Sequence, residues 1–134
     1  MAEKTEESRG ALAAGWEAIL ERSRRWKIEH LASDEFIDLD EAAERLGAPP
    51  EPLEGRLLVL PTPLPGGPPR VPIWALPLAG ETTEALLNEE PDAWALYSFL
   101  DAPDGVFSGR RPRDLLPARL LEVLELLRAL SPPR

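Results

Sequence analysis

Residues 36–47 of the chain read FIDLDEAAERLG, and this stretch decides how the surrounding sequence is interpreted. Asp38 followed three residues later by Glu41 is an Asp-led variant of the capping box that begins a helix. The apolar face of that helix is formed by Leu39, Ala42, Ala43 and Leu46. Gly47 is a favoured residue for ending a helix. The stretch therefore predicts a helix of about two turns that ends in a turn.

The residues after this helix predict a turn, a second brief helix and two β-strands. A short helix can begin in the pair Pro49-Pro50, because proline is tolerated in a first helical turn. Apolar runs typical of strands follow at residues 57–60 and 70–76, and the turn-forming pair Gly66-Gly67 lies between them. We therefore expect residues 34–78 to form a module of two short helices and a two-stranded wing, called the winged module below.

Helices are predicted on both sides of this module. Residues 6–32 have apolar residues at three- and four-residue spacing, Trp16 and Trp26 among them, which indicates one long helix. Residues 91–100 and 117–130 indicate two more helices, and the last is rich in leucine. The expected fold class is mainly α with one short β-hairpin. Its expected parts are an N-terminal helix (residues 1–33), the winged module (residues 34–78) and a small helical domain (residues 79–134).

Composition argues against several kinds of site. The chain has 134 residues with 24 acidic and 15 basic side chains, a net charge of −9, and neither half is basic. Nucleic-acid binders normally present a basic face, because neutralising phosphates supplies much of their affinity. The chain has no cysteine and one histidine, His30, so disulfides, thiolate metal sites and multi-histidine metal sites are excluded. We expect no metal and no cofactor.

No catalytic set is visible in the sequence. His30, Ser33 and Asp34 have the residue types of a catalytic triad, but they lie within one short stretch and nothing suggests oxyanion donors. The charged N-terminus lacks the apolar core of a secretory signal, and no apolar run approaches the roughly 20 residues of a membrane span. We therefore expect a cytoplasmic protein that is not an enzyme and has no membrane partner.

The C-terminal third resembles a known family. Residues 94–130 contain an aromatic helix, an Ala-Pro-Asp-Gly turn, the segment VFSGRRPRDLL and a leucine-rich helix, in that order. This order is similar to the toxin-binding domain of the Xre/MbcA/ParS class of bacterial antitoxins, where a Gly-x-x-Pro-x-x-Leu-Leu segment joins two helices. The matching residues here are Gly109, Pro112, Leu115 and Leu116. Residues 34–78 resemble the small winged helix-turn-helix of excisionase or MerR-like kind that some antitoxin-like proteins carry.

The resemblance implies an antitoxin that binds and neutralises a RES-domain toxin, a NAD-consuming protein, with DNA-binding autoregulation as a further activity. The toxin-binding residues that it implies are Gly109, Arg110, Arg111, Pro112 and Arg113. Arginine suits such an interface because its planar guanidinium can bind a carboxylate or a phosphate through two hydrogen bonds. The same arginines also suit a solvated loop that is held by salt bridges, and this alternative stays open.

The candidates for DNA binding are the only basic residues of the winged module. They are Arg45, Arg56 and Arg70. Residues 48–55, where a DNA-reading helix is expected, contain none of the Arg, Lys, Asn or Gln side chains that read bases. Ten of the 16 prolines lie in residues 49–77. Two outcomes stay open. A dimer binds an operator by combining the arginines of its two copies, or DNA binding has been lost.

Two other functions remain as alternatives to an antitoxin. One is a stand-alone winged-helix DNA-binding transcriptional regulator, and the other is a dimeric scaffold that has lost both partners. We expect a homodimer. Its interface is formed either by the first helix, through Trp16 and Trp26, or by the exposed half of the last helix.

Overall fold

Helices dominate the structure, as the sequence predicts, and account for 63% of it. The computed structural model describes residues 2–63 and 67–130, with side chains from residue 15 onward. In chain order the elements are α1 (Ala2–Leu31), β1 (Phe36–Asp38), α2 (Leu39–Leu46), α3 (Pro50–Leu53), β2 (Arg70–Pro72), the 3₁₀ helix η1 (Ile73–Leu78), α4 (Glu81–Glu89), α5 (Ala93–Asp101), the 3₁₀ helices η2 (Gly105–Phe107) and η3 (Pro112–Leu115), and α6 (Leu120–Leu130). The fold class, mainly α with one short pair of antiparallel strands, is confirmed.

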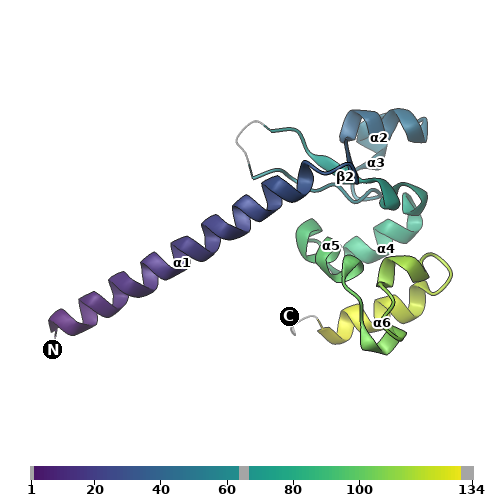
Figure 1. Cartoon of the computed structure of the whole chain (residues 1–134). Coiled ribbons are helices and arrows are strands. Elements are labelled where there is room, and N and C mark those ends of the chain that lie inside the picture. The colour runs from purple at the N-terminus through teal and green to yellow at the C-terminus, as the bar shows by residue number, and fades with distance from the viewer. Residues whose placement is uncertain (1, 64–66, 131–134) are drawn as a thin grey trace. The chain divides into compact units, whose positions relative to one another are not determined.

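The chain divides into two compact units. The first contains Met1–Ser33 and Thr62–Gly67, and the second contains Asp34–Pro61 and Pro68–Arg134. In the first unit, α1 is a continuous helix, which confirms the predicted long helix (Figure 1). Near its end Trp26 stacks on His30, with the ring centroids 4.7 Å apart.

The two strands of the second unit differ from the predicted hairpin. β1 pairs with β2 in antiparallel orientation, so that Phe36 lies opposite Pro72 and Asp38 lies opposite Arg70. The sequence predicts residues 57–60 as the partner of β2, and this prediction is wrong. In that segment Leu60 makes a single isolated bridge, to Arg70.

Proline and burial explain this difference. Pro72 has no backbone N–H, and the chain turns into η1 directly after it, which shortens the predicted strand 70–76 to three residues. Leu57, Leu58 and Leu60 are buried, so their apolar run fills the core instead of forming a long strand. The predicted tip at Gly66-Gly67 lies partly outside the described residues.

One hydrophobic cluster joins β1, α2 and β2. Its buried members are Ile37, Ala42, Leu57 and Val71, and partly buried side chains that include Leu39 and Leu46 pack against them. α2 ends at Gly47, whose φ of +67° is the left-handed conformation that favours glycine, as predicted. The predicted capping bond from Asp38 does not form. Its carboxylate instead pairs with the guanidinium of Arg70 across the strands, at 2.7 Å.

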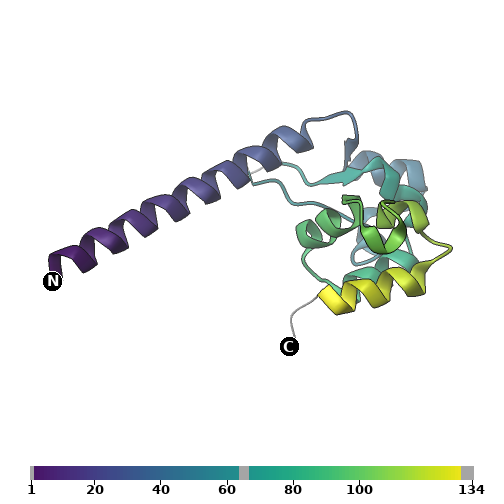
Figure 2. The same ribbon diagram turned by 60° about the horizontal axis from the view of Figure 1, so that its bottom comes forward.

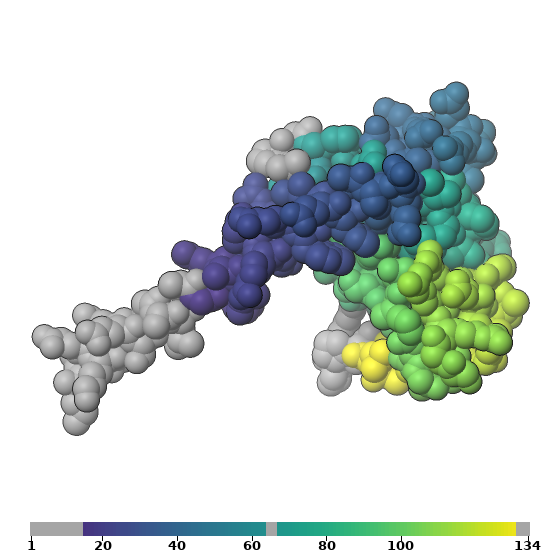
Figure 3. Space-filling model, in the orientation of Figure 1, coloured from purple at the N-terminus to yellow at the C-terminus, as the bar shows by residue number. Residues whose placement is uncertain are grey.

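The C-terminal helices pack around a second set of buried leucine and valine side chains. α6 lies beside α4, and its buried face contributes Val123, Leu124 and Leu127 (Figures 1 and 2). Asp92 caps α5, because its carboxylate accepts hydrogen bonds from the backbone N–H of Trp94 and Ala95, at 3.0 and 3.4 Å. The residues from α5 to α6 form one continuous body in the space-filling view (Figure 3).

Candidate functional site

The segment Asp104–Arg111, called the C-terminal turn below, is closed by backbone hydrogen bonds. The N–H of Asp104 donates to the carbonyl of Arg110 at 3.1 Å, and the N–H of Gly109 donates to the carbonyl of Asp104 at 2.9 Å. The Asp104 carboxylate accepts from the N–H of Val106 at 2.8 Å. The turn therefore has a fixed backbone, in which Val106 is 69% exposed and Arg110 is also exposed.

The arginines next to this turn differ in their surroundings. Arg111 and Arg113 both reach the same Asp101 carboxylate, at 3.6 and 3.2 Å. The side chain of Arg113 is only 16% exposed, and its guanidinium lies over the ring of Trp74, 5.0 Å from the ring centroid. Arg110 is exposed and forms no ion pair with any described residue.

The five predicted toxin-binding residues therefore separate into two groups. Gly109, Arg110 and Arg111 lie at or near the surface. Pro112 is fully buried at the start of η3, and Arg113 is largely buried against Trp74. The first group is available to a partner, whereas the second holds the C-terminal turn to the rest of the fold.

An aromatic cluster lies beneath Arg113, and no pattern in the sequence predicts it. Tyr97 of α5 stacks on Trp74 at 5.9 Å between ring centroids, meets Trp94 edge-on at 5.9 Å and contacts Phe36 of β1 at 5.7 Å. The indole N–H of Trp94 donates to the carbonyl of Pro61 at 3.0 Å. No local spacing links these residues, because they come from separate segments that only the folded chain brings together.

Burial at the centre of this cluster raises the pKa of the Tyr97 hydroxyl well above its ordinary value of 10.0. The negative charges of Asp101 and Glu35 raise this pKa further, while Arg113 and Arg111 lower it. The hydroxyl is therefore neutral throughout the physiological range. Its environment is typical of a packed core, in which the ionised form is disfavoured.

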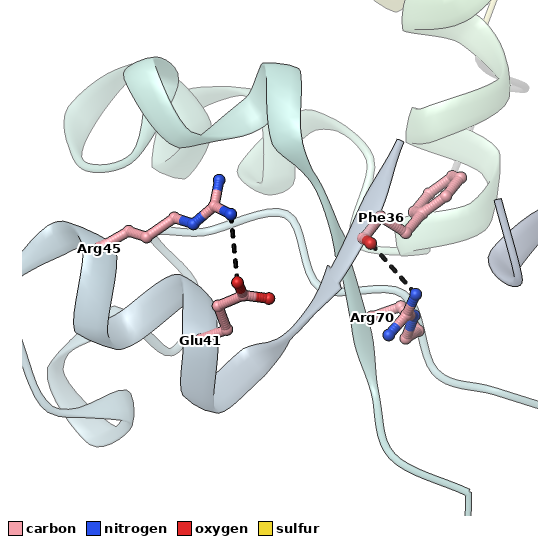
Figure 4. A network of polar contacts seen from close by, with 4 residues as sticks. All are labelled: Phe36, Glu41, Arg45 and Arg70. Carbon is pink, nitrogen blue, oxygen red and sulfur yellow. Dashed lines mark hydrogen bonds and ion pairs between the residues drawn. The ribbon is translucent and has the colours of Figure 1, made fainter. Parts of the chain in front are cut away.

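The three predicted DNA-binding arginines each hold a carboxylate. Arg45 pairs with Glu41 one turn earlier in α2 at 3.1 Å, and Arg56 pairs with Glu84 of α4, also at 3.1 Å. Besides its ion pair across the strands, Arg70 donates to the carbonyl of Phe36 at 3.1 Å (Figure 4). A phosphate would have to compete with these carboxylates for each guanidinium.

The excess of negative charge is confined to the second part of the chain. Residues 1–33 have six acidic and six basic side chains, whereas residues 34–134 have 18 acidic and nine basic, a net charge of −9. This part contains all the predicted DNA-binding and toxin-binding residues. Its overall field repels nucleic acid and attracts cationic partners.

An open cavity of about 670 Å³ lies where the family resemblance places a DNA-reading helix. It is formed by the start of α2, by α3 and the residues after it, and by the end of α4 and the start of α5. Its lining residues are Leu39, Pro50, Glu51, Leu53, Glu54, Gly55, Leu57, Val59, Leu87, Asn88, Pro91 and Ala93. We call it the acidic groove, because Glu51 and Glu54 are exposed at an otherwise mostly apolar surface.

Other kinds of site are not found in the described part of the chain. Within residues 15–63 and 67–130, whose side chains the structure describes, no group of three His, Cys, Asp or Glu side chains could hold a metal ion. Among the same residues, no helix combines the length and the apolar character needed to cross a bilayer. Comparison with known protein families, with curated proteins and with solved structures finds no match for the chain.

Proposed function

We propose that this protein acts by binding another protein, as an antitoxin-like inhibitor of a NAD-consuming toxin of the RES-domain type, with the C-terminal turn as the contact surface. The observation that carries this proposal is the closed turn that presents Val106 and Arg110 to solvent. The action needs no catalytic residue, metal or cofactor in this chain, and it takes place in the cytoplasm.

The geometry of the turn suits protein binding. A backbone closed at Asp104, Gly109 and Arg110 loses little conformational freedom when a partner docks, which lowers the entropic cost of association. In a complex, the exposed apolar side chain of the turn can bury area, and the exposed guanidinium can bind a carboxylate through two hydrogen bonds. Seated at the entrance of the toxin's active site, the turn would block the entry of NAD.

Arg113 and Pro112 have a supporting role in this proposal. Their burial against Trp74 and α5 fixes where the chain leaves the turn, and therefore where Arg110 and Arg111 are placed. Substitution of Arg110 should weaken toxin binding with little change in stability, whereas substitution of Arg111 should weaken binding and also remove an ion pair with Asp101. Substitution of Arg113 should lower stability.

The test is co-expression with a RES-domain toxin from the same genome, ideally from the adjacent open reading frame. Wild-type protein should restore growth and NAD levels, and Arg110→Glu or Arg111→Glu should weaken the measured complex by about tenfold or more. Arg45→Glu, which changes an exposed arginine on α2, is the matched control and should bind as the wild type does. A toxin that stays fully active beside an excess of wild-type protein would exclude the proposal.

A stand-alone DNA-binding regulator receives less support, because Arg45, Arg56 and Arg70 are all engaged by carboxylates. The dimeric scaffold without partners differs from the antitoxin in one measurable respect. A scaffold would leave the toxin unaffected while keeping its own oligomeric state, so the co-expression experiment separates these two functions.

A further inference from the structure

The exposed part of α1 has an apolar stripe with cations on both borders. Trp16, Ile19 and Leu20 are 62%, 50% and 51% exposed, and their spacing of i, i+3 and i+4 places them on one face of the helix. Because successive residues of an α-helix are rotated by about 100° around its axis, Arg22 and Arg24 lie on opposite borders of this stripe. Both are exposed, and neither forms an ion pair with any described residue.

The acidic groove has the complementary character. Leu53, Leu57 and Val59 contribute to its apolar lining, and Glu51 and Glu54 are its two carboxylates. Neither carboxylate forms an ion pair within the part of the chain that the structure describes. An apolar surface with two unneutralised carboxylates favours an occupant that is apolar and cationic.

We propose that the acidic groove binds the Trp16–Arg24 stripe of α1 from a second copy of this chain. The contact is a helix laid in a groove, a recognition mode in which side chains at i, i+3 and i+4 act as anchors. Trp16, Ile19 and Leu20 bury their apolar surface against the groove. Arg22 and Arg24 meet Glu51 and Glu54, which fixes the orientation of the helix.

Charge favours this occupant over DNA. The groove belongs to the part of the chain whose net charge is −9, while the stripe belongs to a segment whose acidic and basic residues balance. Two copies can exchange their α1 helices reciprocally, which forms two identical contacts and closes the assembly as a symmetric dimer. The proposal is independent of whether the protein neutralises a toxin.

The first experiment is charge reversal in the full-length chain, followed by sedimentation equilibrium. Glu51→Lys/Glu54→Lys should raise the dimer dissociation constant by about tenfold or more, because two attractive pairs become repulsive. The matched control is Glu44→Lys/Glu125→Lys, which makes the same change in net charge at two exposed carboxylates outside the groove. This control should dimerise as the wild type does.

The second experiment tests the pairing itself. Arg22→Glu/Arg24→Glu should weaken the dimer to a similar degree, and combining it with Glu51→Lys/Glu54→Lys should restore the dimer to within a few-fold of wild type. The four-site variant keeps the wild-type net charge. Arg25→Glu is the control on α1, because Arg25 lies on the opposite side of the helix and pairs with Glu21 at 3.8 Å.

Three results would overturn the proposal. The first is a wild-type protein that stays monomeric at every concentration. The second is a dimer that is insensitive to the groove substitutions, and the third is a four-site variant that fails to restore the dimer. If the groove substitutions prevent folding, as seen by circular dichroism, Arg22→Glu/Arg24→Glu on the exposed helix still decides the question.

Discussion

The guanidinium of Arg113 lies over the indole of Trp74, with its Cζ atom 5.0 Å from the ring centroid. The same indole stacks on Tyr97, and the guanidinium also reaches Asp101 at 3.2 Å. Residues from η1, α5 and η3 therefore meet at one point. The contact joins the segment predicted as a winged module to the segment predicted as a toxin-binding domain. It also assigns a structural role to one of the arginines that the sequence assigns to a partner.

Removing this contact should destabilise the fold. We expect Arg113→Ala to lower the free energy of unfolding by about 2 kcal/mol, because it removes a cation–π contact and leaves the partly buried Asp101 with only Arg111. Arg110→Ala, on the exposed turn, should change the same quantity by less than about 0.5 kcal/mol. Urea unfolding of both variants, followed by circular dichroism, gives the comparison. Equal losses would mean that Arg113 is not an anchor.

Alkaline pH should destabilise the protein through Tyr97. The pKa of the hydroxyl is raised in the folded state, so above about pH 10 the unfolded chain releases this proton while the folded chain keeps it. The contribution of Tyr97 to stability is therefore fully present below pH 10 and is lost as the pH rises above it. Tyr97 is the only tyrosine in the chain, so tyrosinate absorbance reports on it alone.

The measurement is a pH titration followed by tyrosinate absorbance. The native protein should show no tyrosinate until well above pH 10, and the protein unfolded in urea should titrate near pH 10. Tyr97→Phe keeps the ring and lacks the ionisable group. Its stability should depend less steeply on pH above 10 than that of the wild type. A native titration at the ordinary value would show that the hydroxyl is not shielded from water.

Local signals in the sequence predict much of the fold. Gly47 ends α2 and Pro112 begins η3, because φ preferences and capping act over a few residues and can be read directly. The strand partner of β2 could not be predicted in this way. Phe36–Asp38 precedes a strong helix signal, and its pairing with Arg70–Pro72 depends on a long-range contact that no local pattern encodes.

The candidate sites also depend on long-range contacts that no local sequence pattern encodes. The sequence identifies Gly109–Arg113 as a group, yet burial separates Arg110 from Arg113, and burial depends on where Trp74 lies. No local pattern predicts the acidic groove, because its lining comes from three segments that are distant along the chain, namely Leu39, residues 50–59 and residues 87–93. Its signal in the sequence was indirect, namely the absence of cations in residues 48–55, where a DNA-reading helix was expected.

Wild-type protein should bind DNA weakly or not at all, because the three candidate arginines are neutralised by Glu41, Glu84 and Asp38. Fluorescence anisotropy with duplex from the protein's own promoter should show little dependence of affinity on salt concentration. The triple variant Asp38→Asn/Glu41→Gln/Glu84→Gln frees the guanidiniums by removing three negative charges. It should bind DNA more tightly at low salt. Strong salt-dependent binding by the wild type would contradict the expectation.

Two glycines of the C-terminal turn offer a matched pair of substitutions. Gly109 has a φ of +81° with no other atom within 4 Å of the position of an added Cβ, whereas Gly105 has equal space and no positive φ. Gly109→Ala should therefore lower the free energy of unfolding by about 1–2 kcal/mol through backbone strain alone. Gly105→Ala should be neutral or stabilise the fold by up to about 1 kcal/mol.

The same pair tests the role of the turn in binding. If a fixed backbone at Asp104–Arg111 presents Arg110 to a partner, Gly109→Ala weakens the complex with the toxin, while Gly105→Ala leaves it unchanged or slightly tighter. Gly109→Asn should lie between the two, because asparagine tolerates a positive φ better than alanine does. Thermal unfolding measures the strain and calorimetric titration measures the binding. Weaker binding by Gly105→Ala than by Gly109→Ala would show that the conformation of the turn at Gly109 does not control recognition.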